Sequence, residues 1–142
     1  MIYDEKHPHL QVVYLIILEA VQHRSNQVQL LRTTEDITVT FRSGESEFIR
    51  DQMPGRFWLS LLSILHFMLS ETVNQILWDS ATATSVDTTE IHPNTILITD
   101  AFPNYEITFL KDLKAEADLP VYLDVTFSEK SVIIRIRQTN QT

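Results

Sequence analysis

The chain has 142 residues, of which 44% are hydrophobic and 21% charged, and its formal net charge is −8. These values are typical of one folded domain and not of a disordered chain. The acidic excess argues against nucleic acid and anionic membrane surfaces as partners, because both bind through lysine and arginine. The absence of cysteine excludes disulfides, thiolate nucleophiles and Cys-ligated zinc, and two glycines cannot supply a glycine-rich phosphate loop.

The chain shows no sign of membrane targeting or of a second domain. Its first nine residues are too polar for a signal peptide, and the longest apolar run, Val12–Leu18, is far shorter than the roughly 20 residues that span a bilayer. We therefore expect a soluble cytoplasmic protein without membrane insertion. A single domain should cover 1–142, with residues 1–8 and 138–142 frayed.

The first expected helix covers Leu10–His23, where apolar residues recur at helical spacing. The segments Val28–Arg32 and Ile37–Arg42 alternate apolar and polar residues, so they are expected to form two strands joined by a turn. Cross-strand pairing then brings apolar residues together on one face, namely Leu30 with Val39 and Val28 with Phe41.

A second turn is expected at residues 43–44, leading to a short strand at Glu47–Arg50. The Pro-Gly pair at 54–55 interrupts the chain. A second helix then begins near Arg56 and runs to Ser70 or as far as Leu77.

The rest of the chain is predicted to form a loop and two hairpins. Asp79–Glu90 is rich in serine and threonine, which predicts an exposed loop. Thr95–Ala101 and Tyr105–Leu110 flank a Pro-Asn turn and are expected to form a third hairpin. The fourth hairpin, 120–137, turns at 129–130 and pairs Phe127 with Val132, Val125 with Ile134, Leu123 with Ile136, Asp124 with Arg135, and Tyr122 with Arg137.

The predicted fold is therefore a two-layer α+β domain with a mostly antiparallel sheet and two main helices. The expected order of elements is α-β-β-β-α-β-β-β-β. Strands joined by short turns, with helices covering one face, favour this class over a doubly wound parallel sheet.

The second helix has more apolar surface than contact with one sheet requires. Its polar positions fall within an arc of about 120°, whereas a helix on a sheet needs an apolar stripe of only about 100°. Either the sheet and the first helix cover both flanks, or one flank binds a second copy or another protein. In the second case the candidate partner-binding residues are Leu15, Leu18, Trp58, Leu62 and Leu65.

No residue set has a catalytic or metal-binding signature, so we expect no enzyme, no cofactor and no metal. His7 and His9 lack a third ligand at suitable spacing, and Glu19 with His23 is expected to be a surface pair. The group of His66, Ser63 and Ser70 fits the polar stripe of a helix better than a catalytic triad.

Two further sets of charged residues are candidates for chemistry. Asp100 and Asp124 could act as paired carboxylates, but Asp124 is expected to face a cross-strand arginine. A local basic strip for an anionic ligand could form from four arginines: Arg32, Arg42, Arg135 and Arg137. Salt-bridged strand exteriors are the commoner outcome for such residues.

The stretch ILEAVQHRSNQVQLLRTTEDITVTFRSGE, followed by RFWLSLLSILHFMLSE, resembles the small PAS-like domain that precedes the motor in bacterial type II secretion and type IV pilus assembly ATPases. The later hairpin VYLDVTFSEKSVIIRIR is similar to a strand pair of the same family, so the likeness covers Leu10–Arg137. Residues 25–29 replace the family's Asp and His, and residues 43–44 replace its Asp-Gly turn. The resemblance implies a PAS-like α+β module without ATPase residues.

The chain also resembles type III secretion chaperones, which are short, acidic and poor in cysteine and have an α-β-β-β-α-β-β core. That resemblance implies a dimer, formed through a helix, that holds extended client segments on apolar surface. The strand-like segment 121–137 departs from the family, which ends in a helix.

These observations predict a non-enzymatic interaction or adaptor module of a secretion-related kind, either homodimeric or bound to a protein partner. An alternative is a small-ligand sensor with an apolar pocket lined by Phe41, Trp58 and Phe109.

Overall fold

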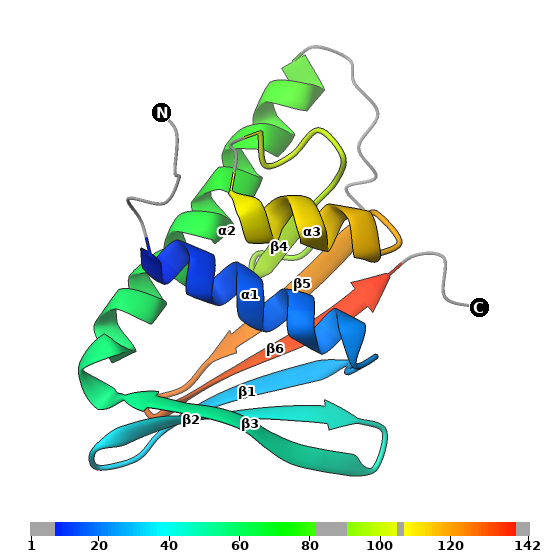
Figure 1. Ribbon diagram of the computed structural model, residues 1–142. Coiled ribbons are helices and arrows are strands. Elements are labelled where there is room, and N and C mark those ends of the chain that lie inside the picture. The colour runs from blue at the N-terminus through cyan, green and yellow to red at the C-terminus, as the bar shows by residue number, and fades with distance from the viewer. Residues whose placement is uncertain (1–7, 82–90, 105–106, 139–142) are drawn as a thin grey trace.

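The computed structural model describes residues 8–81, 91–104 and 107–138 (Figure 1). The elements are α1 (Pro8–Gln22), β1 (Gln27–Arg32), β2 (Asp36–Ser43), β3 (Ser46–Pro54), the short 3-10 helix η1 (Gly55–Phe57), α2 (Trp58–Ala81), β4 (Thr95–Ile98), α3 (Thr108–Glu116), β5 (Val121–Phe127) and β6 (Ser131–Gln138). The fold class is α+β, as the sequence predicts.

The strands form a six-stranded antiparallel sheet in the order β3-β2-β1-β6-β5-β4. The register predicted for β1 and β2 is confirmed, and so are all five pairs predicted for β5 and β6. These two hairpins meet at the centre of the sheet, where β1 pairs with β6. This long-range pairing is the step that joins the two ends of the chain into one domain.

One predicted element is wrong. The strand predicted at Tyr105–Leu110 is not formed by the described residues 107–110, because α3 begins at Thr108 and a third helix takes its place, while residues 105–106 lie outside the described part. Ile107, Leu110 and Leu113 recur at a spacing of three and are all buried, which is the pattern of a helix with one apolar side. The observed order is consequently α-β-β-β-α-β-α-β-β.

The boundaries of α2 and of the chain ends also differ from the prediction. The helix continues through residues 79–81, which were expected to begin the exposed loop, and residues 82–90 lie outside the described part. Pro8 belongs to α1 and Gln138 to β6, although both were expected to be frayed. The rest of the predicted frayed ends, 1–7 and 139–142, also lies outside the described residues.

All three helices lie on one face of the sheet, with α3 alongside α1 (Figure 1). The strand residues that face the helices form one buried apolar core with them: Val28, Leu30, Ile37, Val39, Phe41, Ile96, Ile98, Leu123, Val125, Val132 and Ile134. Alternating apolar residues on β1, β2, β5 and β6 therefore produce the two layers, whereas β3 has no buried residue and β4 is buried at all four positions.

The two edges of the sheet are protected in different ways. At the β4 edge, the buried hydroxyl of Thr72 on α2 accepts a hydrogen bond from the Leu97 amide at 3.1 Å and donates one to the Met68 carbonyl at 3.0 Å. At the β3 edge, a bulge opposite Val39 and Thr40 interrupts the ladder. Each feature makes its edge a poorer template for a further strand. Within the described residues, none of the helices is both long and apolar enough to span a membrane.

Candidate functional site

The five predicted partner-binding residues lie in or against the core of the chain itself. Leu18 is 5% exposed, Trp58 3% and Leu65 0%. Leu15 and Leu62 are half-buried and pack against the same core. The third helix explains part of this burial, because α3 lies along α1 and covers surface that two helices alone would leave open.

The exposed apolar residues of α2 are different ones. Leu59 is 72% exposed, Leu77 64% and Val73 49%. Together with three exposed polar residues they form a continuous line on the exposed side of α2. We call this line the α2 strip: Leu59, Ser63, His66, Ser70, Val73 and Leu77. At about 100° per residue the six positions fall within an arc of about 80°.

The α2 strip contains no Asp, Glu, Lys or Arg, although the chain has a net charge of −8. In the 24 residues of α2 the only charged residues are Glu71 and Asp79, and neither belongs to the strip. A solvent-facing helix surface normally has charged residues opposite its apolar stripe. The composition of this surface is therefore closer to that of a protein interface, whose centre is poor in charge.

A shallow hollow of about 400 Å³ lies beside the middle of the strip. His66 borders it and stacks on the Phe127 ring of β5, with ring centroids 4.4 Å apart and planes inclined by 8°. Pro93 and Asn94 line its other side. The strip therefore has a concave flank at its centre and protruding leucines at both ends.

The face of the sheet opposite the helices contains three of the four predicted basic residues: Arg42, Arg135 and Arg137. Arg32, at the end of β1, instead has the strand parity of the core-facing residues and pairs with Ile37. Arg42 donates a hydrogen bond from Nε to Glu47 at 3.1 Å, and Arg137 pairs with Asp124. Arg32 and Arg135 are exposed. Two of the four arginines thus have carboxylate partners on neighbouring strands. The positive charge of the predicted basic strip is therefore partly neutralised.

Asp124 is held by three hydrogen bonds. The Thr95 hydroxyl donates to Oδ1 at 2.8 Å, Arg137 Nη2 donates to the same oxygen at 3.0 Å, and Arg137 Nε donates to Oδ2. Arg135 is its backbone partner, as predicted, but the ion pair is with Arg137. Burial raises the pKa of Asp124, but the bonds from Arg137 and Thr95 outweigh burial, and the net pKa is lowered.

Replacing Asp124 with Asn should lower the free energy of unfolding by about 1.5 kcal/mol at pH 7, a value reduced for partial exposure. A lowered folded-state pKa means that Asp124 stabilises the fold above its unfolded pKa and loses this effect as pH falls through the folded pKa. The difference between wild type and variant should therefore shrink as the pH is lowered from 7 through the folded-state pKa of Asp124. Urea titrations across pH measure it, with the exposed Asp112→Asn as control. A difference that is constant with pH would contradict the assignment.

The other candidate groups are used structurally. Glu19 accepts a hydrogen bond from Arg50, not from His23, and this bond raises the pKa of Arg50. The ring of His23 contacts Phe48 edge-on, with centroids 5.7 Å apart. Asp100 is exposed in the loop after β4, and nothing in the structure places it beside Asp124.

Metal-binding groups do not emerge from the fold either. In the described part of the chain, no three His, Asp or Glu side chains gather closely enough to hold a metal ion. The side chains of His7 and His9 lie outside the described residues.

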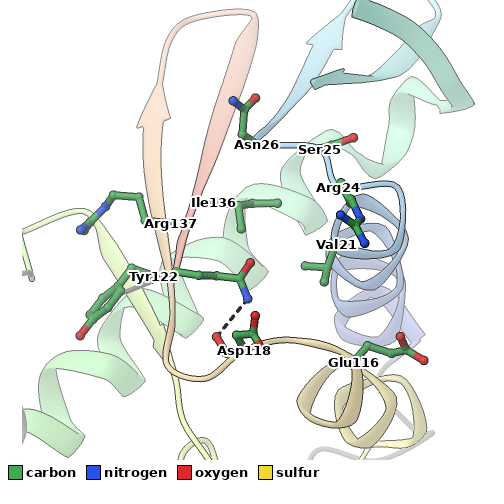
Figure 2. A pocket seen from close by; sticks show the side chains of 10 residues that line it. Val21, Arg24, Ser25, Asn26, Glu116, Asp118, Tyr122, Ile136 and Arg137 are labelled. Carbon is green, nitrogen blue, oxygen red and sulfur yellow. Dashed lines mark hydrogen bonds between the residues drawn. The ribbon is translucent and has the colours of Figure 1, made fainter. Parts of the chain in front are cut away.

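A cavity of about 800 Å³ lies where the ends of α1 and α3 meet β5 and β6 (Figure 2). Its walls mix charges: Arg24, Glu116 and Asp118 lie around it, and the Gln138 amide donates to the Asp118 carbonyl at 3.0 Å. Ser25 also lines it, and its buried Oγ has no hydrogen-bond partner in the described protein. This cavity is polar, unlike the predicted sensor pocket.

The three residues predicted for that sensor pocket are part of the core. Phe41 and Trp58 are buried in it, and Phe109 packs against it. All three residues therefore lie in or against the hydrophobic core.

Comparison with known proteins adds no assignment, since no family model matches the chain and no curated protein is significantly similar to it.

Proposed function

We propose that this protein is a non-enzymatic interaction module that binds protein through the α2 strip. The observation that supports this most directly is the exposure of Leu59, Val73 and Leu77 on a helix side without Asp, Glu, Lys or Arg, in a strongly acidic chain. Scattered single apolar residues are ordinary on a protein surface, but here they share one line with two serines and a histidine and with no Asp, Glu, Lys or Arg. A protein partner would remove this line from water.

A non-enzymatic role is supported by the use of the titratable groups. The carboxylates of Asp124 and Glu19, which the sequence offers as candidates for acid-base chemistry, are held by arginines that tie elements of the fold together. Arg137 joins β6 to β5, and Arg50 joins the β3 edge to α1. These carboxylates therefore serve to hold neighbouring elements of the fold together.

The strip variant Leu59→Glu/Leu77→Glu is expected to weaken partner binding at least tenfold, because it places charges in a desolvated contact. Both side chains are exposed, so folding should be unaffected. Binding is measured by photo-crosslinking in cells of the source organism, with a benzophenone amino acid at position 70, and stability by thermal unfolding.

Ile49→Glu is the matched control, since Ile49 is exposed but lies on β3, away from the strip. It should leave the crosslinked species unchanged. The proposal fails if position 70 gives no crosslinked protein, or if the strip variant gives the same products as wild type.

A further inference from the structure

We infer that the cavity between the ends of α1 and α3 binds a short zwitterionic peptide of two or three residues. The carboxylate of the ligand lies at Arg24, and its ammonium group lies at Glu116 and Asp118. This site is separate from the α2 strip and does not depend on the proposed function. The inference follows from the charges around the cavity, from its amide and apolar groups and from its size.

The positive wall of the cavity is formed by Arg24, which follows α1 (Figure 2). Its backbone is left-handed, with φ of 58°, and it closes the helix: the Arg24 amide donates to the Val21 carbonyl at 3.0 Å and the Ser25 amide to the Ala20 carbonyl at 2.8 Å. Glycine is the usual residue at this position of a helix end, so the turn itself does not call for arginine. Among the described residues no carboxylate pairs with the Arg24 guanidinium, which is therefore available to an anionic group.

The negative wall is formed by Glu116, in the last turn of α3, and by Asp118, just beyond it. The C-terminal end of a helix already carries partial negative charge, so carboxylates there are unfavourable for folding. Lys114, the basic residue of the same turn, donates to the carbonyls of Asp100 and Pro103. Within the part of the chain that the structure describes, neither Glu116 nor Asp118 forms an ion pair. An ammonium group of a ligand would reduce the repulsion at this helix end.

The groups between the two charged walls complement a peptide. The side-chain amide of Asn26 forms no hydrogen bond with other described residues, and Gln138 uses only its amide nitrogen, on a backbone carbonyl. Carboxamides donate and accept hydrogen bonds as peptide groups do. Ser25 adds a buried hydroxyl that has no partner in the described protein. The half-buried side chains of Val21 and Ile136 supply apolar surface for a ligand side chain.

The size of the cavity favours a short peptide over a free amino acid. A space of about 800 Å³ is on the order of 9 Å across and lies within the usual range of ligand pockets. The charged groups of one amino acid are roughly 3 Å apart, and each further residue adds up to about 3.5 Å. Two or three residues can therefore reach from the α3 end to the α1 end. The charged side chains of both walls are exposed, so we expect weak binding with a dissociation constant on the order of 1 mM.

The tripeptide Ala-Leu-Ala is the probe, added up to about 20 mM to isotope-labelled protein and followed by NMR. Saturable shifts are expected at the backbone amides of residues 24–26 and 117–118 and at the side-chain amide of Asn26. Blocking either terminus, by N-acetylation or by C-terminal amidation, should weaken binding by about fivefold or more, because it removes one charged group. Free leucine should bind more weakly by a similar factor, because it cannot reach both walls.

The variant Arg24→Gly separates ligand binding from stability. Glycine suits the left-handed position, so the variant should melt at the wild-type temperature or above it. Its affinity for Ala-Leu-Ala should nevertheless fall by about fivefold or more, since the guanidinium is lost. Arg135→Gln is the matched control, because Arg135 is exposed on the uncovered face of the sheet, and it should bind the tripeptide as the wild type does.

The variant Asp118→Asn tests the opposite wall. It should weaken binding of Ala-Leu-Ala but leave binding of the N-acetylated tripeptide unchanged, because that ligand has no ammonium group to lose. An equal loss for both ligands would show that Asp118 does not contact the ammonium group and would overturn the inference.

Three further results would overturn it: no saturable shift with Ala-Leu-Ala at about 20 mM, equal affinity for the free and the blocked tripeptides, or unchanged affinity in Arg24→Gly. None of these results bears on the α2 strip, which is tested by the crosslink at position 70. The failure of one proposal is therefore distinguishable from the failure of the other.

Discussion

Leu65→Ala is expected to lower the free energy of unfolding by about 3 kcal/mol. Leu65 lies on the core side of α2, is fully buried and belongs to the cluster that joins the helices to the sheet. Truncation removes apolar contacts and leaves a cavity that close-packed neighbours fill only in part. Urea unfolding followed by circular dichroism measures the loss.

Leu59→Ala is the matched control, because it makes the same chemical change on the opposite side of the same helix. Leu59 is mostly exposed, so its truncation should change stability by no more than about 0.5 kcal/mol. Equal losses for the two variants would contradict the assigned sides of α2. Loss of partner binding by Leu65→Ala with unchanged stability would instead support the sequence-based prediction that Leu65 contacts a partner.

Gly55→Ala is expected to destabilise the fold by about 2 kcal/mol, for a different reason. A Cβ atom at this position would lie 2.8 Å from the backbone oxygen of Glu35 and 3.1 Å from its carbonyl carbon. The same oxygen accepts a hydrogen bond from the Gly55 amide at 2.7 Å, so it cannot move away without losing that bond. The substitution must therefore displace the turn between β1 and β2 or the start of η1.

The chain's other glycine provides the comparison. Gly44 has φ of +64° in the turn between β2 and β3, and a Cβ atom added there would have no neighbouring atom within 4 Å. Gly44→Ala should cost about 1 kcal/mol through backbone conformation alone, and Gly44→Asn less, because asparagine tolerates this region. A Gly55→Ala variant as stable as Gly44→Asn would show that the approach to Glu35 is not tight.

The candidate site was only partly predictable. The excess of apolar residues on α2 is visible in the sequence, but which of them remain exposed depends on how the helix rotates against its neighbours. Trp58 and Leu65 face the core, while Leu59 and Leu77, which have the same hydrophobicity as other leucines, face the solvent. Periodicity gives the angles of residues relative to one another around the helix axis, whereas packing decides which of these residues face the core.

The sequence by itself determined the local pairings of this protein. Strict alternation, with turn residues between the runs, specified the registers of β1 with β2 and of β5 with β6, because a slip by one residue would expose a whole apolar face. Only the tertiary structure decided the pairing of β1 with β6, the choice of helix for α3 and the burial of Leu18. A short apolar run such as the one that ends at Leu110 fits the period of a strand as well as that of a helix. The contact of this segment with α1 selects the helix.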